Sequence, residues 1–344
     1  MATIQDVAAA AGVSVATVSR VLGNPAIVAV PTQKKVLKVI RRLRYVPNAS
    51  ATSLRKASTA KLLVTVPDIA NPFFSLIIQG LEDAAQRAGY SVLLGDTHHD
   101  ARIEDRYGLM LPRREADGLI FLGHRLPTSV KDWIRTQPGL APVVNGCEYS
   151  PTLGVPSVHI DNARAAAEMM EHLYALGHRR VGVITGPLTS PLSRDRLRGT
   201  RSRARAHDAY RLLSVVDGDF SVDSGIAGAA RLLAQSNPPT AIFCFNDEMA
   251  IGVLDYAHRH DRSVPHSLSV AGFDDIRFSR YSHPPLTTIG QPMREIGRET
   301  VRLLLGILRG TIRKPVSVTL PHRLEVRTST GPAPRRARAA AQRP

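Results

Sequence analysis

The sequence predicts two kinds of fold in one chain: an all-α head of three short helices, then an α/β body of two doubly wound parallel-sheet lobes. Helical hydrophobic spacing extends to about residue 45, and from Lys61 short apolar runs alternate with amphipathic helices. Basic charge is concentrated in the first 60 residues. A length of 344 residues with 43% hydrophobic content allows two or three domains with sizeable cores.

The head begins with a predicted pair of helices, 4–11 and 15–22, joined by the turn Gly12-Val13-Ser14. Thr3 and Ser14 precede these helices, where a side-chain oxygen can accept a hydrogen bond from a free backbone N–H. Gly12 suits a turn residue with positive φ. Ala8 is small where the helices cross. The shared apolar interior is expected to contain Val7, Val13, Val18 and Val21. A third helix is predicted from Pro31-Thr32 to about Leu43.

This spacing is that of a helix-turn-helix, and the local charge strengthens the interpretation. Residues 1–60 contain nine Lys and Arg residues but a single acid, Asp6, whereas residues 61–330 have a net charge of only +4. A compact basic head suits a polyphosphate, because each neutralised phosphate releases counterions. A solvated basic face without a partner is the alternative. Val15, Ala16 and Arg20 would project toward a major groove.

The body is expected to begin with strands at 62–67, 91–95, 118–123 and 143–146 and helices at 73–88, 103–114 and 129–135. A second series comprises helices 163–176 and 248–259 and strands 181–185, 241–245 and 268–271. A further helix, 293–309, follows both series, which suggests that the chain crosses back between the lobes. The predicted domains are therefore 1–46, a hinge at 47–60, a body at 61–330, and a disordered basic tail at 331–344.

One stretch departs from this pattern. Residues 200–208 alternate arginines with small residues where a helix packed on the sheet is due, and they show no apolar stripe at helical spacing. This stretch is either an exposed basic helix without a core face or the trace of two compensating frame shifts in the coding sequence.

The head motifs resemble the lactose-repressor family of transcription regulators. The resemblance lies in residues 11–20, in Arg42-x-x-Tyr-x-Pro-Asn48, and in Ala51-Thr52-Ser53-Leu54. It implies that bases are read by the outer face of the second helix, that phosphates are held by Thr17, Ser19 and Asn24, and that Leu54 wedges into a minor-groove step. The full predicted DNA-binding set is Thr3, Ser14, Val15, Ala16, Thr17, Ser19, Arg20, Asn24 and Leu54. Family members bind palindromic operators as dimers, and a tetramer is the alternative assembly.

The body contains a predicted ligand site at the carboxyl ends of its strands, where open parallel sheets bind ligands. Residues directly after predicted strands include Asp68, Asp161, Asn246-Asp247 and Asp274-Asp275, whose oxygens suit hydroxyl-rich ligands. Phe73, Phe74 and Phe220 offer flat apolar walls. The alternative is that Asp161 and Asp274 only cap helices and do not contact a ligand.

Segments such as 67–74, 158–162 and 272–275 resemble the family's effector domain, which is similar to periplasmic sugar-binding proteins. The resemblance implies that Arg196 and Asp274 grip ligand hydroxyls, Phe73 and Phe220 pack on a ring, and Asn246 lines the cleft. The predicted effector set is Phe73, Phe74, Asp161, Arg196, Phe220, Asn246 and Asp274. Residues 291–292 and 295–299 look closest to the cytidine-responsive branch, so a nucleoside is the expected effector and a sugar the alternative.

Two other classes of function fit the sequence less well. A stand-alone sugar- or nucleoside-binding protein is disfavoured by the basic head and by the absence of a secretory signal in residues 1–20. A metal-dependent hydrolase would rest on Asp96-Thr97-His98-His99-Asp100, but no second ligand cluster, nucleophile elbow or phosphate-binding loop motif accompanies it.

The remaining composition favours a cytoplasmic protein, associated with the nucleoid when bound to DNA. No run of 18 uncharged apolar residues is present, and Cys147 and Cys244 lie far apart in apolar stretches as expected for reduced thiols. The sequence thus predicts a sequence-specific DNA-binding repressor under ligand control, without a cofactor, metal or enzymatic activity.

Overall fold

The computed structural model describes residues 2–46, 58–149 and 151–334. It divides into two compact units, a head that extends to Ala60 and a body that begins at Lys61. Most of the predicted hinge, including Leu54, and residues 335–344 of the predicted tail lie outside the described residues.

The head consists of α1 (Ile4–Ala11), α2 (Val15–Gly23), the 3₁₀ turn η1 (Pro25–Ile27) and α3 (Val30–Leu43). Both predicted caps are present. The Thr3 hydroxyl accepts from the Asp6 N–H while the Asp6 carboxylate accepts from the Thr3 N–H, and Ser14 accepts from the Thr17 N–H at 3.1 Å. Gly12 ends α1 with φ +59°, the conformation expected of the turn.

The head core confirms most of the predicted interior. Val7 and Val18 are fully buried, Val21 and Ala8 nearly so, and Val36 and Val39 of α3 complete the cluster; Val13 is only partly buried against it. Because these residues line one side of α2, its opposite side faces solvent.

The first lobe of the body is a six-stranded sheet in the order β11-β5-β4-β3-β1-β2, and every pairing in it is parallel. Its strands are β1 (Lys61–Val66), β2 (Ser91–Asp96), β3 (Gly118–Phe121), β4 (Val143–Gly146), β5 (Ser157–Ile160) and β11 (Ser317–Leu320). Its helices are α5 (Pro72–Arg87), α6 (Ala101–Gly108), α7 (Thr128–Arg135) and α12 (Met293–Leu308). Helix α6 ends at Gly108, whereas the sequence predicted a helix that extends to residue 114.

The second lobe has the order β12-β10-β9-β8-β6-β7 and is parallel except for the antiparallel edge strand β12. Its strands are β6 (Val181–Thr185), β7 (Leu213–Asp217), β8 (Ala241–Cys244), β9 (Ser269–Asp274), β10 (Thr287–Gly290) and β12 (Arg323–Glu325). Its helices are α8 (Asn162–Ala175), α9 (Pro191–Ala206), α10 (Val222–Leu233) and α11 (Asp247–Arg259). The two predicted sheets are confirmed, although the sequence predicted neither α10 nor the strands β7, β10, β11 and β12. It indicated β5 only through the position of Asp161, and α9 only as one of two interpretations of residues 200–208.

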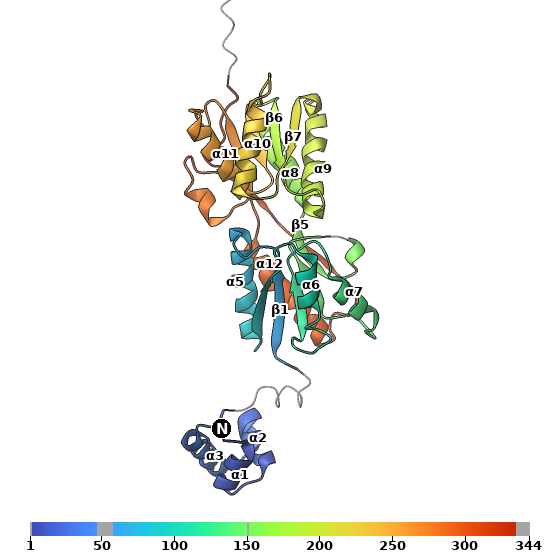
Figure 1. Ribbon diagram of the computed structural model, residues 1–344, viewed down its shortest axis with the longest axis vertical. Helices are drawn as coiled ribbons and strands as arrows, with labels where there is room; N and C mark the ends of the chain where they lie inside the picture. Colours follow the sequence, from blue (N-terminus) through green and yellow to red (C-terminus); the bar gives the residue numbers. More distant parts are fainter. Residues whose placement is uncertain (1, 47–57, 150, 335–344) are drawn as a thin grey trace, which may run out of the picture. The chain divides into compact units, whose positions relative to one another are not determined.

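The chain crosses between the lobes three times (Figure 1). The crossings lie between β5 and α8, between β10 and α12, and between β11 and β12. The predicted return through the helix at 293 is therefore correct, because α12 packs against α5 in the first lobe. Separate apolar cores fill the two lobes.

The prediction that residues 200–208 lack a core face is wrong. α9 includes residues 200–206, and Leu197, Thr200 and Ala204 are buried on the side that packs against α8. A Cβ atom at Gly199 would lie 1.9 Å from the Ala163 carbonyl oxygen, so the two backbones approach closely. Small residues serve this interface in place of large apolar ones, since a close helix crossing leaves no room for them.

The ordered body also extends past the predicted boundary at residue 330. Gly331 donates its N–H to the Ser269 hydroxyl, and Ala333 donates its N–H to the Leu176 carbonyl. The predicted disordered tail therefore cannot begin at 331.

Candidate effector cleft and DNA-reading face

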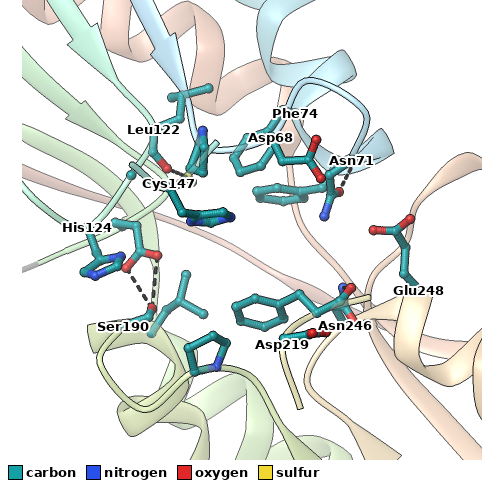
Figure 2. Close-up of a pocket in the computed structure, with 18 of the residues that line it drawn as sticks. Asp68, Asn71, Phe74, Leu122, His124, Cys147, Ser190, Asp219, Asn246 and Glu248 are labelled. Carbon is teal, nitrogen blue, oxygen red and sulfur yellow. Dashed lines mark hydrogen bonds between the residues drawn. The ribbon is translucent and has the colours of Figure 1, made fainter. Parts of the chain in front are cut away.

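A cavity of about 580 Å³ lies between the two lobes of the body, within the size range of small-molecule sites. It is lined by residues that follow the carboxyl ends of strands from both sheets, as the topology of parallel sheets favours. In Figure 2, Asp68, Asn71 and Phe74 come from the first lobe, and Asn246, Asp219 and Glu248 come from the second.

Six of the seven predicted effector residues line this cleft: Phe73, Phe74, Arg196, Phe220, Asn246 and Asp274. Asp161 is not brought together with them. It caps α8 by accepting from the Arg164 N–H at 2.9 Å, and it lines a separate cavity of about 220 Å³ with Tyr149 and His159. The capping alternative therefore describes Asp161, because β5 leads into a crossing between the lobes rather than ending at the cleft.

Arg196 lies at the base of the cleft and is only 3% exposed. Its Nε donates to the Asn162 Oδ1 at 2.8 Å, its Nη1 donates to the Phe245 carbonyl, and its Nη2 lies 3.8 Å from the Asp274 Oδ1. The guanidinium also lies over the Phe273 ring, 3.6 Å from its centroid. These contacts fix a planar cation whose remaining N–H groups can face a ligand.

Asp274 is held in an unusual backbone conformation. Its φ is +117°, and its Oδ1 accepts from the Gln291 Nε2 at 2.7 Å. Phe220 and Cys147, which also line the cleft, have φ values of +75° and +61°. Non-glycine residues in this region are strained, and such strain clusters at functional sites.

The aromatic walls come from opposite lobes. Phe73 and Phe74 of α5 pack edge to face with ring centroids 5.2 Å apart. Phe220 follows β7, and its carbonyl accepts from the Asn246 Nδ2 at 2.7 Å while Asn246 also caps α11. The two lobes thus present flat apolar faces beside fixed amide and carboxylate groups, an arrangement suited to a ring that carries hydroxyls.

Glu148 joins the two lobes across the cleft. It follows β4, and its carboxylate oxygens accept from the Ser190 hydroxyl of the second lobe at 3.1 and 3.2 Å; Figure 2 shows these bonds at Ser190. Glu148 is buried, and burial raises its pKa to about 7 despite the Ser190 hydrogen bond. The contact can form only when the lobes stand close together.

Other acids around the cleft have raised pKa values for the same reason. Burial raises the pKa of Asp274 to about 8 although the Arg196 charge opposes it, and burial with the nearby Asp68 charge raises the pKa of Glu248 to about 7. Asp247 lies below the cleft, where burial raises its pKa to about 7. Its carboxylate accepts from Ile276, Ser279 and Thr288, so it holds β9 and β10 in place rather than facing a ligand.

These pKa values predict that the folded protein loses stability as the pH rises from 6.5 to 8. In this range the folded state retains carboxyl protons that the unfolded chain has released, so the unfolded state binds fewer protons. Each such group contributes up to about 1.4 kcal/mol per pH unit. Below pH 6.5 the half-buried His124 and His172 and the buried His178, whose pKa values burial lowers, act in the opposite direction.

Thermal unfolding of the full chain should therefore give a lower midpoint at pH 8 than at pH 6.5. Glu148→Gln, which is neutral at both pH values, should flatten this dependence. A midpoint that is equal or higher at pH 8 would contradict the assignment of protons to these acids.

Several cleft residues were not in the predicted set: His124 and Arg125 after β3, Cys147 and Glu148 after β4, and Ser190, Asp219 and Glu248 in the second lobe. The signal for the first four was available, because they directly follow predicted strands. Ser190 had no such signal, since it lies in the loop before α9, whose start at Pro191 the sequence did not predict.

The second site predicted from the sequence is the outer face of α2. Val15, Ala16 and Arg20 are exposed there, and Thr17 and Ser19 are half-buried beside them. The Thr17 hydroxyl lies 2.9 Å from the Ser14 hydroxyl, and Asn24 follows the helix as its C-cap. Thr3 lies at the start of α1, exposed. The structure describes every predicted DNA-binding residue except Leu54.

The His and Asp side chains between Asp96 and Asp100, which could have bound a metal, are dispersed. Asp100 caps α6, the His98 Nδ1 lies 3.5 Å from the Asp96 Oδ2, and His99 lines the cleft. Among the described residues no group of three His, Cys, Asp or Glu side chains is placed to hold a metal ion. Cys147 and Cys244 are free and buried. No single described helix is long and apolar enough to cross a membrane; α1 and α2 together have the length and composition but are bent by 105°.

Comparison with known protein families and proteins gives matches over both units. A model of bacterial regulatory proteins of the lacI family matches residues 3–48, and a periplasmic binding protein-like domain matches residues 170–330. The HTH-type transcriptional repressor CytR of Escherichia coli (strain K12) is 41% identical over 310 residues, which cover 90% of each chain. Catabolite control protein A of Priestia megaterium is 36% identical over 335 residues, covering 95% of this chain and 99% of that protein.

Solved structures match over nearly the same length. The Lac repressor dimer bound to operator and the anti-inducer ONPF superimposes with a TM-score of 0.86 at 28% identity, covering 96% of this chain and 99% of that one. The complex of the transcriptional regulator CelR with cellobiose gives a TM-score of 0.72 at 30% identity, covering 96% and 100%.

Proposed function

The chain belongs to the lacI family of bacterial regulatory proteins, and from this premise we propose that it is a repressor whose affinity for operator DNA is controlled by a nucleoside bound between the lobes of the body. As a member of that family it is a DNA-binding transcription regulator and not an enzyme, and its partners are operator DNA, a small-molecule effector and a second copy of itself. It therefore acts in the cytoplasm; association with the nucleoid is part of the proposal.

The observation that carries the effector proposal is the chemistry of the cleft walls. Phe73 and Phe220 supply flat apolar surfaces, while Arg196, Asn246 and Asp274 supply fixed polar groups. A nucleoside has the matching parts, since its base stacks on rings and its ribose hydroxyls pair with carboxylates and amides. The resemblance of residues 291–292 and 295–299 to the cytidine-responsive branch makes cytidine the first candidate.

The charge of the cleft also argues against phosphorylated ligands. Five acids line it, Asp68, Glu148, Asp219, Glu248 and Asp274, against two arginines, Arg125 and Arg196. A phosphate dianion would find few cations to pair with in such a site, because Arg196 already donates to Asn162 and Phe245. It would also be repelled by Asp219, whose pKa is lowered by its hydrogen bond from Ser221, and by each of the other acids once it ionises. A nucleoside is therefore favoured over the corresponding nucleotide.

The test is a thermal-shift and operator-binding series with cytidine, uridine, adenosine, cytidine monophosphate, ribose and cellobiose. Cytidine should stabilise the full chain and change its operator affinity, and the monophosphate should do neither. If a sugar acts and no nucleoside does, the regulator assignment stands and the nucleoside proposal is wrong.

In the head, we propose that Val15, Ala16 and Arg20 read the bases. Thr17, Ser19 and Asn24 would bind phosphates, and Thr3 and Ser14 lie at the starts of helices that face the DNA backbone. Arg20→Ala should weaken binding to a selected operator by roughly 1–3 kcal/mol more than binding to a scrambled duplex, because a bidentate base contact discriminates by that amount. Fluorescence anisotropy on both duplexes measures the difference. Arg41→Ala, which removes an exposed charge from α3, serves as the control and should weaken both alike. Equal losses for Arg20→Ala would make it a phosphate contact.

Leu54 is proposed as the minor-groove wedge of the hinge. Leu54→Ala should reduce the bend of operator DNA while the head remains folded, because the apolar wedge is what unstacks the base step. Gel mobility of circularly permuted operator fragments reports the bend, and circular dichroism reports the fold. A bend of unchanged size would remove Leu54 from this role.

A further inference from the structure

The arginines that stand out in the sequence around residues 200–208 belong neither to the cleft nor to the head, although Arg196 of the same helix lines the cleft. Residues 191–212, which form α9 and the 3₁₀ turn η3 (Tyr210–Leu212), contain seven arginines and two aspartates and so have a net charge of +5. Residues 61–330 as a whole have a net charge of +4. The body is therefore close to neutral apart from this one segment.

Four of these arginines lie on one side of α9. Arg194, Arg198, Arg201 and Arg205 are spaced by four, three and four residues, and all four are exposed. This spacing puts one guanidinium on the same helix face at each turn, about 5.4 Å apart, over a total of about 16 Å. The opposite side of the helix carries its buried residues. We call these four residues the arginine stripe.

The charge of the stripe is only partly compensated. Arg198 pairs with Asp195, and Arg203, beside the stripe, lies 3.3 Å from Glu171. Within the described ranges, no carboxylate oxygen lies within 4.0 Å of the guanidinium groups of Arg201, Arg205 or Arg211. The Arg205 guanidinium lies over the exposed Tyr210 ring, 4.5 Å from its centroid, which holds the planar cation at the surface.

We propose that the arginine stripe, together with Arg211, binds the phosphate backbone of a second DNA duplex, distinct from the operator held by the head. Guanidinium groups pair with phosphates through parallel N–H···O bonds, and a row of them matches a ligand with repeated anionic groups. The family's established binding places the chain on DNA, so duplex phosphate is the polyanion present at the highest local concentration.

The surroundings of the stripe favour DNA over an acidic protein partner. The exposed neighbours Ser202 and Ala206 are small, and the large exposed side chains, Tyr210 and Leu212, lie only beyond the C-terminal end of α9. The stripe therefore lacks the central aromatic or large apolar anchor around which protein interfaces are built. Figure 1 shows α9 beside the edge strand β7, at the opposite side of the second lobe from α11. A duplex can therefore approach the stripe without covering α10 or α11.

The test is a capture assay with the full chain. Operator duplex is immobilised and saturated with protein, free protein is washed away, and a long labelled duplex without operator is added over a range of salt concentrations. Wild-type protein should capture the label with a strong salt dependence. In the variant R201Q/R205Q/R211Q the slope of log affinity against log salt should fall by about 2.7, since each lost phosphate contact contributes about 0.9.

Matched variants separate the stripe from charge in general. R106Q/R113Q/R309Q removes the same number of exposed arginines from the first lobe and should capture as wild type does, while R201K/R205K/R211K should retain most of the capture. Operator affinity and thermal midpoint should be unchanged in all three. Equal capture by wild type and R201Q/R205Q/R211Q would overturn the proposal, as would a stripe-dependent capture of polyglutamate with none of DNA.

Discussion

Replacing Arg196 with alanine is expected to lower the free energy of unfolding of the protein by about 3–5 kcal/mol, the cost of removing one partner from a buried charge pair. The substitution leaves Asp274 without its nearby cation and leaves the Asn162 side chain and Phe245 carbonyl without their donor. It also removes the cation over the Phe273 ring. Because the pKa of Asp274 is already about 8, its protonation in the variant will limit the loss near neutral pH.

Chemical denaturation of the full chain measures this effect. Arg198→Ala is the matched control, since it removes an exposed arginine two residues further along α9 and should change stability by no more than about 0.5 kcal/mol. The double variant Arg196→Ala/Asp274→Ala should cost less than the sum of the two single changes, because the two groups interact directly. Additive losses would mean that the 3.8 Å approach of the pair contributes no coupling.

The second large effect is expected from Asp274→Asn, which should abolish the response of operator affinity to the effector. A coupling of about 1–3 kcal/mol corresponds to a shift of roughly 5–150-fold, and this shift should disappear. Asparagine keeps the shape of the side chain and an oxygen to accept from Gln291, but an NH2 group replaces the second carboxyl oxygen, which can accept from a ligand hydroxyl. Operator affinity without ligand should be unchanged, because Asp274 lies in the body and not in the head.

Asp275→Asn is the control for this experiment. Asp275 is the next residue, but its carboxylate pairs with Arg327 at 2.6 Å and Arg280 at 3.2 Å and does not line the cleft. This variant should lose some stability while keeping the full effector response. If Asp274→Asn responds to the active ligand as the parent does, the cleft is not the site of coupling.

The sequence predicts a structural feature correctly where that feature depends on a few neighbouring residues, as a helix cap or a turn does. Thr3, Ser14 and Gly12 were predicted from capping and turn preferences, and each occupies the expected position. Strands β4 and β6 were predicted with their observed bounds, because short apolar runs between turns describe buried parallel strands.

The predictions that are wrong or missing share one physical cause. At these positions the structure is determined by contacts between segments that are distant in the sequence. Asp161 and Asp274 both follow strands, but only the path of the chain after each strand determines which one meets the cleft. In α9 the interface depends on the absence of side-chain bulk at Gly199 and Ala204, and a search for large apolar residues does not detect it. Strand β11 belongs to the first sheet although some 155 residues separate it from β5, its partner.

The three crossings between the lobes have a consequence for the order in which the newly made chain can fold. β5 is complete at Ile160, but Ile77 and Leu81 of α5 are covered by α12, which ends only at Leu308. At a synthesis rate of about 5–20 residues per second, the 221 residues between the end of α5 at Arg87 and the end of α12 take roughly 11–44 s to make, and the apolar face of α5 waits that long for its partner helix. Neither lobe can be completed from a contiguous piece of the nascent chain, and the exposed face of α5 is a site where chaperones can bind during synthesis.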